Sequence, residues 1–405
     1  MEPEIQPASQ SEEPASADAR GSDPQEPLTP GPNSREIRGM DWMLNGPHGL
    51  RAGWSLAIFV ILFRLFSVIV GTIAVGLYPA VTKYDFSPAT TLVGESVPFL
   101  AMLGAVAMVG LFEHCGIEEF NLSGPRRPLN FFSGIAAGFL ALSALVAALA
   151  WGGWLHFGPI ALTGAAVVKF GALWGCAFLL VGCVEEGIFR CFLQFTLTRS
   201  INFWWALAIV GGLCADLLLR SRGQVGIVAF FWMTPLAAIT GNALWGVFAV
   251  AILGIAPCFV LHLKNATHNG FWQAAWVTST LFGFIHTGNN GENWIGIFAA
   301  ATIGFVFCVS IWVTGSAWWA IGCHAAWDWA ETYFYGTADS GLPAKGHYLT
   351  TSPAGNVLWS GGADGPEGSL LVLGAIVLLL VALLAIYGRK RAAIRAEAAV
   401  EQLTA

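Results

Sequence analysis

The sequence has few charged residues for its length. Lysine, arginine, aspartate and glutamate make up 11% of its 405 residues, while hydrophobic residues make up 56%. Because a soluble domain carries about 25% charged residues, this composition excludes an ordinary soluble protein and indicates an integral membrane protein. A basic stripe is also missing, so no nucleic-acid partner is expected.

Several short motifs of soluble enzymes are missing as well. The eight cysteines form no CxxC pair and show no metal-finger spacing. We interpret them as small apolar helix residues without disulfides. No HExxH or HxxEH zinc-protease motif is present, and there is no GxSxG nucleophile elbow. The sequence therefore does not indicate a standard zinc peptidase or a serine hydrolase.

The chain instead contains long apolar runs of helical length, rich in Gly, Ala, Leu and Val. They predict an all-α fold, a polytopic membrane helix bundle with about 8–10 transmembrane helices, rather than a β-barrel. The expected spans lie at about 54–79, 94–113, 132–155, 168–198, 203–219, 236–262, 272–288, 294–314, 317–335 and 369–388.

Composition divides the chain further. Residues 1–45 are rich in Pro, Ser, Glu and Asp, so we expect a disordered tail. This tail lacks the apolar segment of a cleavable signal peptide, and the first span is expected to anchor itself. We expect N-terminal transmembrane helices in 46–162, a substrate-facing loop in 336–368, and a last transmembrane helix with a basic tail in 369–405.

About ten spans place both termini on the same side of the membrane. Basic residues gather on that side, so the positive-inside rule predicts cytoplasmic N- and C-termini. They are Arg35, Arg38, Arg51, Arg126, Arg127, Arg199, Lys264, Arg389, Lys390, Arg391 and Arg395. Arg220 and Arg222 would lie on the opposite side, which is an exception to the rule.

Three segments place ionisable side chains in an apolar, helical context. A charged side chain at the bilayer centre costs about 2.5–3.5 kcal/mol on insertion scales, so such residues mark function or a paired charge. The segments are Glu185-Glu186-Gly187-Ile188-Phe189-Arg190, Phe282-Gly283-Phe284-Ile285-His286 and His324-Ala325-Ala326-Trp327-Asp328. We infer that the three segments form one site.

The first segment combines two carboxylates with one arginine. On a helix, Glu186 and Arg190 are four residues apart and can pair, whereas Glu185 is rotated by about 100° from Glu186. We therefore expect Arg190 to neutralise and orient Glu186, and Glu185 to project alone into a polar cavity. The alternative is a charge pair that only locks helices together, but this would leave Glu185 unpaired.

The other two segments supply histidines. Alone, a histidine at the position of His286 is more often a hydrogen-bonded residue at a helix interface than a ligand, and Phe282 is expected to pack rather than react. His324 and Asp328 are four residues apart, so the carboxylate can orient the imidazole, or both groups can face one water or metal. The alternative is a polar pair on an aromatic-belt helix.

Two carboxylate-bearing segments and two histidines suit water activation with oxyanion stabilisation, with or without a metal. A proton-coupled membrane transporter could use the same groups as a proton relay. Against this alternative, the sequence shows no internal repeat and no matched pair of broken helices.

In this order, the three segments resemble the EExxxR, FxxxH and HxxxN/D motifs of the CAAX prenyl endopeptidase and bacteriocin-processing (CPBP or Abi) family of intramembrane proteases. The resemblance makes 163–335 the catalytic core, with an inserted helix pair near 203–262. It implies that Glu185 and His286 activate a water. His324 and Asp328 would stabilise the oxyanion or position that water, with Glu186, Arg190 and Phe282 in support.

The resemblance leaves two chemistries open. A divalent metal such as zinc would be held by Glu185, His286 and His324; otherwise the site works as a metal-free glutamate protease. Asp328 stands where many members have Asn, which favours a role in orienting His324 or binding a metal.

The implied partners are a peptide or membrane-protein substrate and the lipid bilayer, and the implied location is a bacterial inner (plasma) membrane. A non-catalytic scaffold or immunity protein with the same fold is the remaining alternative.

Overall fold

The computed structural model describes residues 44–46, 49–83, 85–222, 244–289, 291–339, 341 and 344–388, and the structural statements below refer to these residues. Helices make up most of them, so the predicted all-α membrane bundle is confirmed. The α-helices are α2 (Ala52–Leu77), α3 (Pro88–Glu113), α4 (Arg127–Trp151), α5 (Ala165–Glu186), α6 (Gln194–Thr198), α7 (Phe203–Ser221), α9 (Leu244–Leu263), α10 (Asn269–His286), α11 (Trp294–Thr314), α12 (Trp318–Asp328), α13 (Val357–Ser360) and α14 (Leu370–Leu383).

Shorter elements complete the fold. Three π-helical segments, η3 (Gly187–Leu193), η4 (Trp329–Tyr335) and η6 (Leu384–Gly388), continue α5, α12 and α14. The 3-10 turns are η1 (Pro79–Thr82), η2 (Ile117–Glu119) and η5 (Pro366–Gly368). Two small antiparallel pairs join β1 (Asn45–Gly46) to β2 (Gly49–Leu50) and β3 (Leu155–Phe157) to β4 (Thr351–Pro353).

Eight of the described helices or helix combinations are long and apolar enough to cross a membrane. They are α2, α3, α4, the continuous α5–α6 rod, α7, α9, α11 and α14 with η6. Shorter or less apolar helices α10 and α12 coincide with the two other expected spans. Large apolar side chains such as Ile61, Val68 and Leu378 are exposed, as expected of surfaces that face lipid.

Several helix boundaries differ from the expected ones, and two of the differences have a clear local cause. Helix α3 begins at Pro88 rather than near 94, because a capping box of Ser87 and Thr90 starts it earlier. Helix α4 ends at Trp151 rather than near 155, because Gly153 adopts a φ of 74°, in the left-handed region. The chain then forms β3.

The connection 336–368 is not a plain loop. Strand β4 pairs with β3, with Leu155 opposite Pro353 and Phe157 opposite Thr351. The short helices α13 and η5 follow and lead into α14. The connection is therefore tied to the bundle at both ends. The division into domains stays a prediction: 1–43, 223–243 and 389–405 lie outside the described residues.

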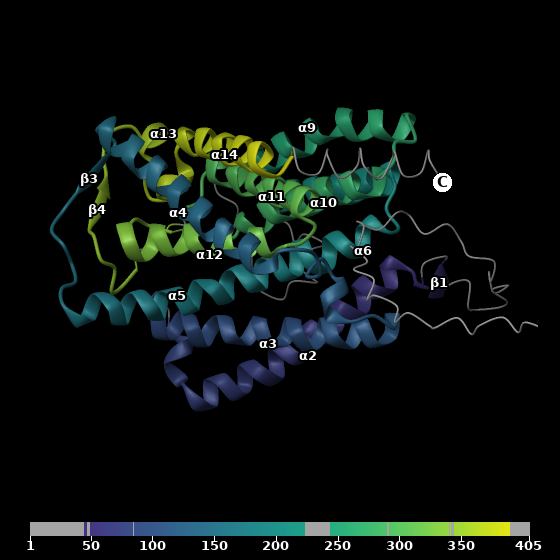
Figure 1. Cartoon of the computed structure of the whole chain (residues 1–405), viewed down its shortest axis with the longest axis horizontal. Coiled ribbons are helices and arrows are strands. Elements are labelled where there is room, and N and C mark those ends of the chain that lie inside the picture. The colour runs from purple at the N-terminus through teal and green to yellow at the C-terminus, as the bar shows by residue number, and fades with distance from the viewer. Residues whose placement is uncertain are drawn as a thin grey trace, which may run out of the picture. The chain divides into compact units, whose positions relative to one another are not determined.

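The inner part of the bundle is built on α12. This helix packs against α4 and α5, and α5 packs against α3 (Figure 1). Backbones approach closely at Gly134 and Gly138 of α4 and at Gly322 of α12, where a Cβ atom would collide with a carbonyl oxygen of the facing helix. Small residues at such contacts are the usual means of packing membrane helices. They fix the position of α12, which carries His324.

Candidate active site

The first motif lies where the helical geometry changes. Helix α5 ends at Glu186, and the chain continues as the π-helix η3 before α6 begins. Single π-turns inside α-helices are frequent at functional sites. The pairing expected of a regular helix is nevertheless present, since Arg190 Nε lies 3.2 Å from Glu186 Oε2 and both side chains are fully buried.

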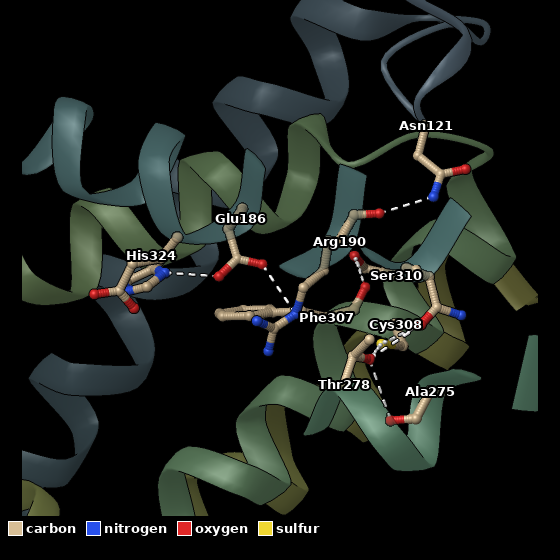
Figure 2. A network of polar contacts seen from close by, with 11 residues as sticks. Asn121, Glu186, Arg190, Ala275, Thr278, Phe307, Cys308, Ser310 and His324 are labelled. Carbon is tan, nitrogen blue, oxygen red and sulfur yellow. Dashed lines mark hydrogen bonds and ion pairs between the residues drawn. The ribbon is translucent and has the colours of Figure 1, made fainter. Parts of the chain in front are cut away.

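Arg190 occupies an aromatic and tightly packed site. Its guanidinium carbon lies 4.2 Å from the ring centre of Phe282 and 5.5 Å from that of Phe307. At Gly304 of α11, a Cβ atom would collide with the guanidinium, so only glycine leaves room there. The Arg190 backbone carbonyl accepts a hydrogen bond of 2.7 Å from Asn121 Nδ2 (Figure 2). Phe282 thus packs against the arginine.

Glu186 lies between Arg190 and His324 (Figure 2). His324 Nδ1 is 2.8 Å from Glu186 Oε1 and donates to it, because a carboxylate can only accept. The other ring nitrogen, Nε2, is 3.6 Å from Asp328 Oδ2 and 3.8 Å from Glu185 Oε2. His324 is therefore surrounded by three carboxylates, and its Nε2 faces two of them.

Glu185 is not buried like its neighbour. Its side chain is 29% exposed, and its Oε2 forms no hydrogen bond with any described residue. The two carboxylates therefore differ in their surroundings. Glu186 is held in a charge pair with Arg190, whereas Glu185 lines a cavity.

His286 ends α10, and its ring orientation is also defined. Its Nδ1 lies 2.7 Å from the carbonyl oxygen of Phe282, which can only accept, so we assign the proton to Nδ1. The Nε2 atom of neutral His286 then carries a lone pair. The Phe282 and His286 rings are in contact, with centres 4.7 Å apart.

These residues meet at one cavity of about 200 Å³, large enough for several water molecules. Glu185, Phe282, His286, His324 and Asp328 all line it. The structure thus brings all seven predicted residues together: five line the cavity, and Glu186 and Arg190 lie behind the lining residue His324.

Three further carboxylates line the same cavity and were not predicted from the sequence. They are Glu95 of α3 and two residues of the connection to α14, Asp339 and Glu367. Glu95 could have been found, because an ionisable residue inside a membrane span is a functional candidate. Asp339 and Glu367 carry no such signal, since an acidic residue in a loop is ordinary.

Buried acids continue from the cavity into this connection. Burial raises the pKa of Glu367 to about 8, and the nearby Asp339 and Asp364 add to the effect. Burial also raises the pKa of Asp364 to about 7 and that of Glu292 well above its ordinary value. Trp327 Nε1 donates a hydrogen bond of 2.8 Å to Glu367 Oε1, which fixes this side chain beside Asp328.

The site was also expected to be able to hold a metal through Glu185, His286 and His324. Within the described parts of the chain, no three His, Cys, Asp or Glu side chains are placed to hold an ion together. Metal binding by Glu185, His286 and His324 therefore stays a prediction from the resemblance.

Carboxylates and histidines from all three motifs line one cavity inside this membrane helix bundle. Residues 258–330 match the family described as Type II CAAX prenyl endopeptidase Rce1-like. This segment contains the second and third motifs, so the predicted resemblance to CPBP proteases is confirmed, and the match implies a membrane protease. No curated protein and no solved structure matches the chain.

Proposed function

We propose that this protein is an intramembrane endopeptidase that hydrolyses a peptide bond with a water molecule activated by Glu185 and His286. One observation carries the proposal: Glu185, His286, His324 and Asp328, from three separate motifs, line one cavity inside a membrane bundle. Water must reach a hydrolytic site, and this cavity has room for it.

In the proposed mechanism, Glu185 and His286 share the first step. The carboxylate of Glu185 orients the water, and the Nε2 lone pair of His286 accepts one of its protons. The hydroxide forms a bond to the peptide carbonyl carbon, and the carbonyl oxygen becomes an oxyanion. The protonated His286 then delivers its proton to the departing amine as the C–N bond breaks.

His324 and Asp328 act on the other side of the carbonyl. His324 carries a proton on both nitrogens in this mechanism: Nδ1 donates to Glu186, and Nε2 donates to the oxyanion. Asp328, 3.6 Å from Nε2, balances the charge of the ring and limits its rotation. Arg190 holds Glu186 in place, so Glu186 and Arg190 are positioning residues for His324.

The proposed substrate is a peptide or a segment of a membrane protein that reaches the cavity within the bilayer. We also propose a bacterial inner (plasma) membrane with cytoplasmic termini. Among the described residues, Arg51, Arg126, Arg199 and Lys264 support this orientation. Of the two exceptions, Arg220 is only 8% exposed and lies 3.6 Å from Asp216, so it does not behave as a surface charge. Arg222 is exposed and stays an exception to the rule.

The proposal is tested with detergent-purified protein and a peptide library, beside Glu185→Gln and His286→Ala. Two exposed residues that do not line the cavity supply matched controls, Glu119→Gln and His156→Ala. We expect products from the wild type and both controls, and none from the two site variants. Products that persist in Glu185→Gln would overturn the assignment of this carboxylate.

The buried Asp364 and the half-buried Glu292 and Glu367 favour one second candidate, a proton-coupled transporter, because a chain of acids can relay protons. If folded protein cleaves no peptide but moves a solute into liposomes along a proton gradient, the transporter replaces the protease. If it does neither, the protein is a non-catalytic scaffold or immunity protein.

A further inference from the structure

The cavity wall carries an unusual excess of negative groups. Five carboxylates line it, and none of the described residues that line it is Lys or Arg. They are Glu95, Glu185, Asp328, Asp339 and Glu367. The proposed hydrolysis uses only two of them, Glu185 and Asp328. Glu95, Asp339 and Glu367 therefore have no role in it.

A further carboxylate lies behind this wall without a partner. Glu331, one turn after Asp328, is fully buried, and neither of its oxygens has a hydrogen-bond partner among the described residues. It is close enough to Glu367, Asp339 and Asp328 to interact with all three electrostatically. Glu331 does not line the cavity itself, so it adds an unpaired acid behind the wall.

Within the described part of the chain, no cationic side chain forms an ion pair with Glu331, Asp364 or Glu367. Buried carboxylates without a paired cation are expensive to ionise, and a cation brought in from outside would stabilise them.

The rest of the wall suits a long cationic side chain. Five aromatic residues line the cavity together with the acids: Phe86, Phe178, Phe282, Phe307 and Trp327. Aromatic faces contact the methylene stem of lysine or arginine and also attract the charged head.

We propose that the acidic end of the cavity is a substrate subsite for a lysine or arginine side chain. This inference rests on the proposed protease function and names its substrate class. Asp328 places the subsite next to the reacting centre, because it lies 3.6 Å from His324 Nε2 and lines the same cavity as Asp339 and Glu367. The charged residue of the substrate therefore lies directly beside the scissile bond, and a carboxylate at that position is repelled.

The test uses three peptides that differ only at one position beside the cleaved bond, with lysine, norleucine or glutamate there. For the wild type, we expect kcat/KM for the lysine peptide to exceed that for the norleucine peptide about ten-fold or more, with the glutamate peptide lowest. Equal values, or a preference for norleucine or glutamate, would overturn the inference while the protease function stands. Failure to cleave any peptide would overturn both.

Isosteric variants locate the subsite. In Glu367→Gln and Asp339→Asn, the lysine-to-norleucine ratio of kcat/KM should fall towards one, because each removes a carboxyl group that can ionise against the bound lysine and keeps the shape. Glu119→Gln, at a residue that does not line the cavity, should keep the wild-type ratio. An unchanged ratio in both site variants would show that the preference arises elsewhere and would reject this subsite. The wild-type peptide series decides the matter even if a variant does not fold.

Discussion

His324 Nδ1 donates a hydrogen bond of 2.8 Å to Glu186 Oε1, a carboxylate that no solvent reaches. This contact joins α12 to α5 and fixes the plane of the imidazole. It also decides which nitrogen reacts, because only Nε2 remains directed towards Glu185 and Asp328. A buried carboxylate that orients a histidine in this way is a common support of both catalytic and metal-binding imidazoles.

The first prediction concerns the exposed member of the carboxylate pair. Glu185→Gln should reduce kcat by at least about 10²-fold, which is the usual contribution of a general acid–base group, and leave the melting temperature unchanged. The amide keeps the shape but lacks the negative charge with which Glu185 orients the water for proton transfer to His286. Turnover and thermal melting of the purified variant, compared with Glu119→Gln, measure the two effects separately.

Arg190→Ala should instead destabilise the protein. Removing the arginine leaves Glu186 buried without its cation, and breaking a buried pair in this way costs about 3–5 kcal/mol. The matched control is Arg127→Ala, whose partner Glu118 is exposed, so that it should cost less than about 1 kcal/mol. Thermal melting in detergent compares the two variants, and equal stability would show that the buried pair contributes nothing.

The first motif also shows what the sequence could predict. Adjacent acids and an arginine inside an apolar run are improbable without a purpose, so Glu185 and Arg190 stand out at once. The pairing of Glu186 with Arg190 follows from helical spacing, although the π-turn that begins at Gly187 does not. The motif residues are therefore predictable because each is costly in its local context.

The acidic end of the cavity could not be predicted in the same way. Asp339 and Glu367 belong to a connection whose path depends on the pairing of β3 with β4, a contact between segments about 200 residues apart. Nothing in the local sequence indicates that pairing. Glu95 does carry a local signal, but a weaker one than the adjacent acids of the first motif, since it is a single acid near the expected start of a span.

The third prediction tests the room left for Arg190. Gly304→Ala should reduce both activity and stability, because the new methyl group would meet the guanidinium and displace it from Glu186. Gly374→Ala in α14 is the matched control, since its Cβ would meet nothing within 4 Å. That control should be neutral or slightly stabilising, as alanine favours helices over glycine by about 1 kcal/mol. If both variants behave alike, the tight packing at Gly304 is not important.

The fourth prediction concerns metal. As placed, Glu185, His286 and His324 do not come together as an ion site, and the proposed mechanism needs only their side chains. We therefore expect peptide cleavage to survive prolonged dialysis against a chelator. Metal analysis of the dialysed protein is the necessary control. Loss of activity that zinc restores would instead identify these three residues as ligands.

The last prediction follows from the buried acids outside the spans. The pKa of Asp364 is raised to about 7 and that of Glu367 to about 8, mainly by burial. In the unfolded chain such groups titrate near their ordinary values of about 4. Between about pH 4 and pH 8 the unfolded chain therefore binds fewer protons than the native state, so stability falls as pH rises.

This contribution is fully present below about pH 4 and is lost as pH passes the raised pKa values. Asp364→Asn and Glu367→Gln remove the titrating groups, and each should flatten the decline in melting temperature between pH 5 and pH 8. Melting curves of the wild type, both variants and Glu119→Gln measure the slope. The surface variant should keep the wild-type slope. If all four slopes agree, the protons that leave in this range come from other groups, and these two carboxyls are not held neutral by burial.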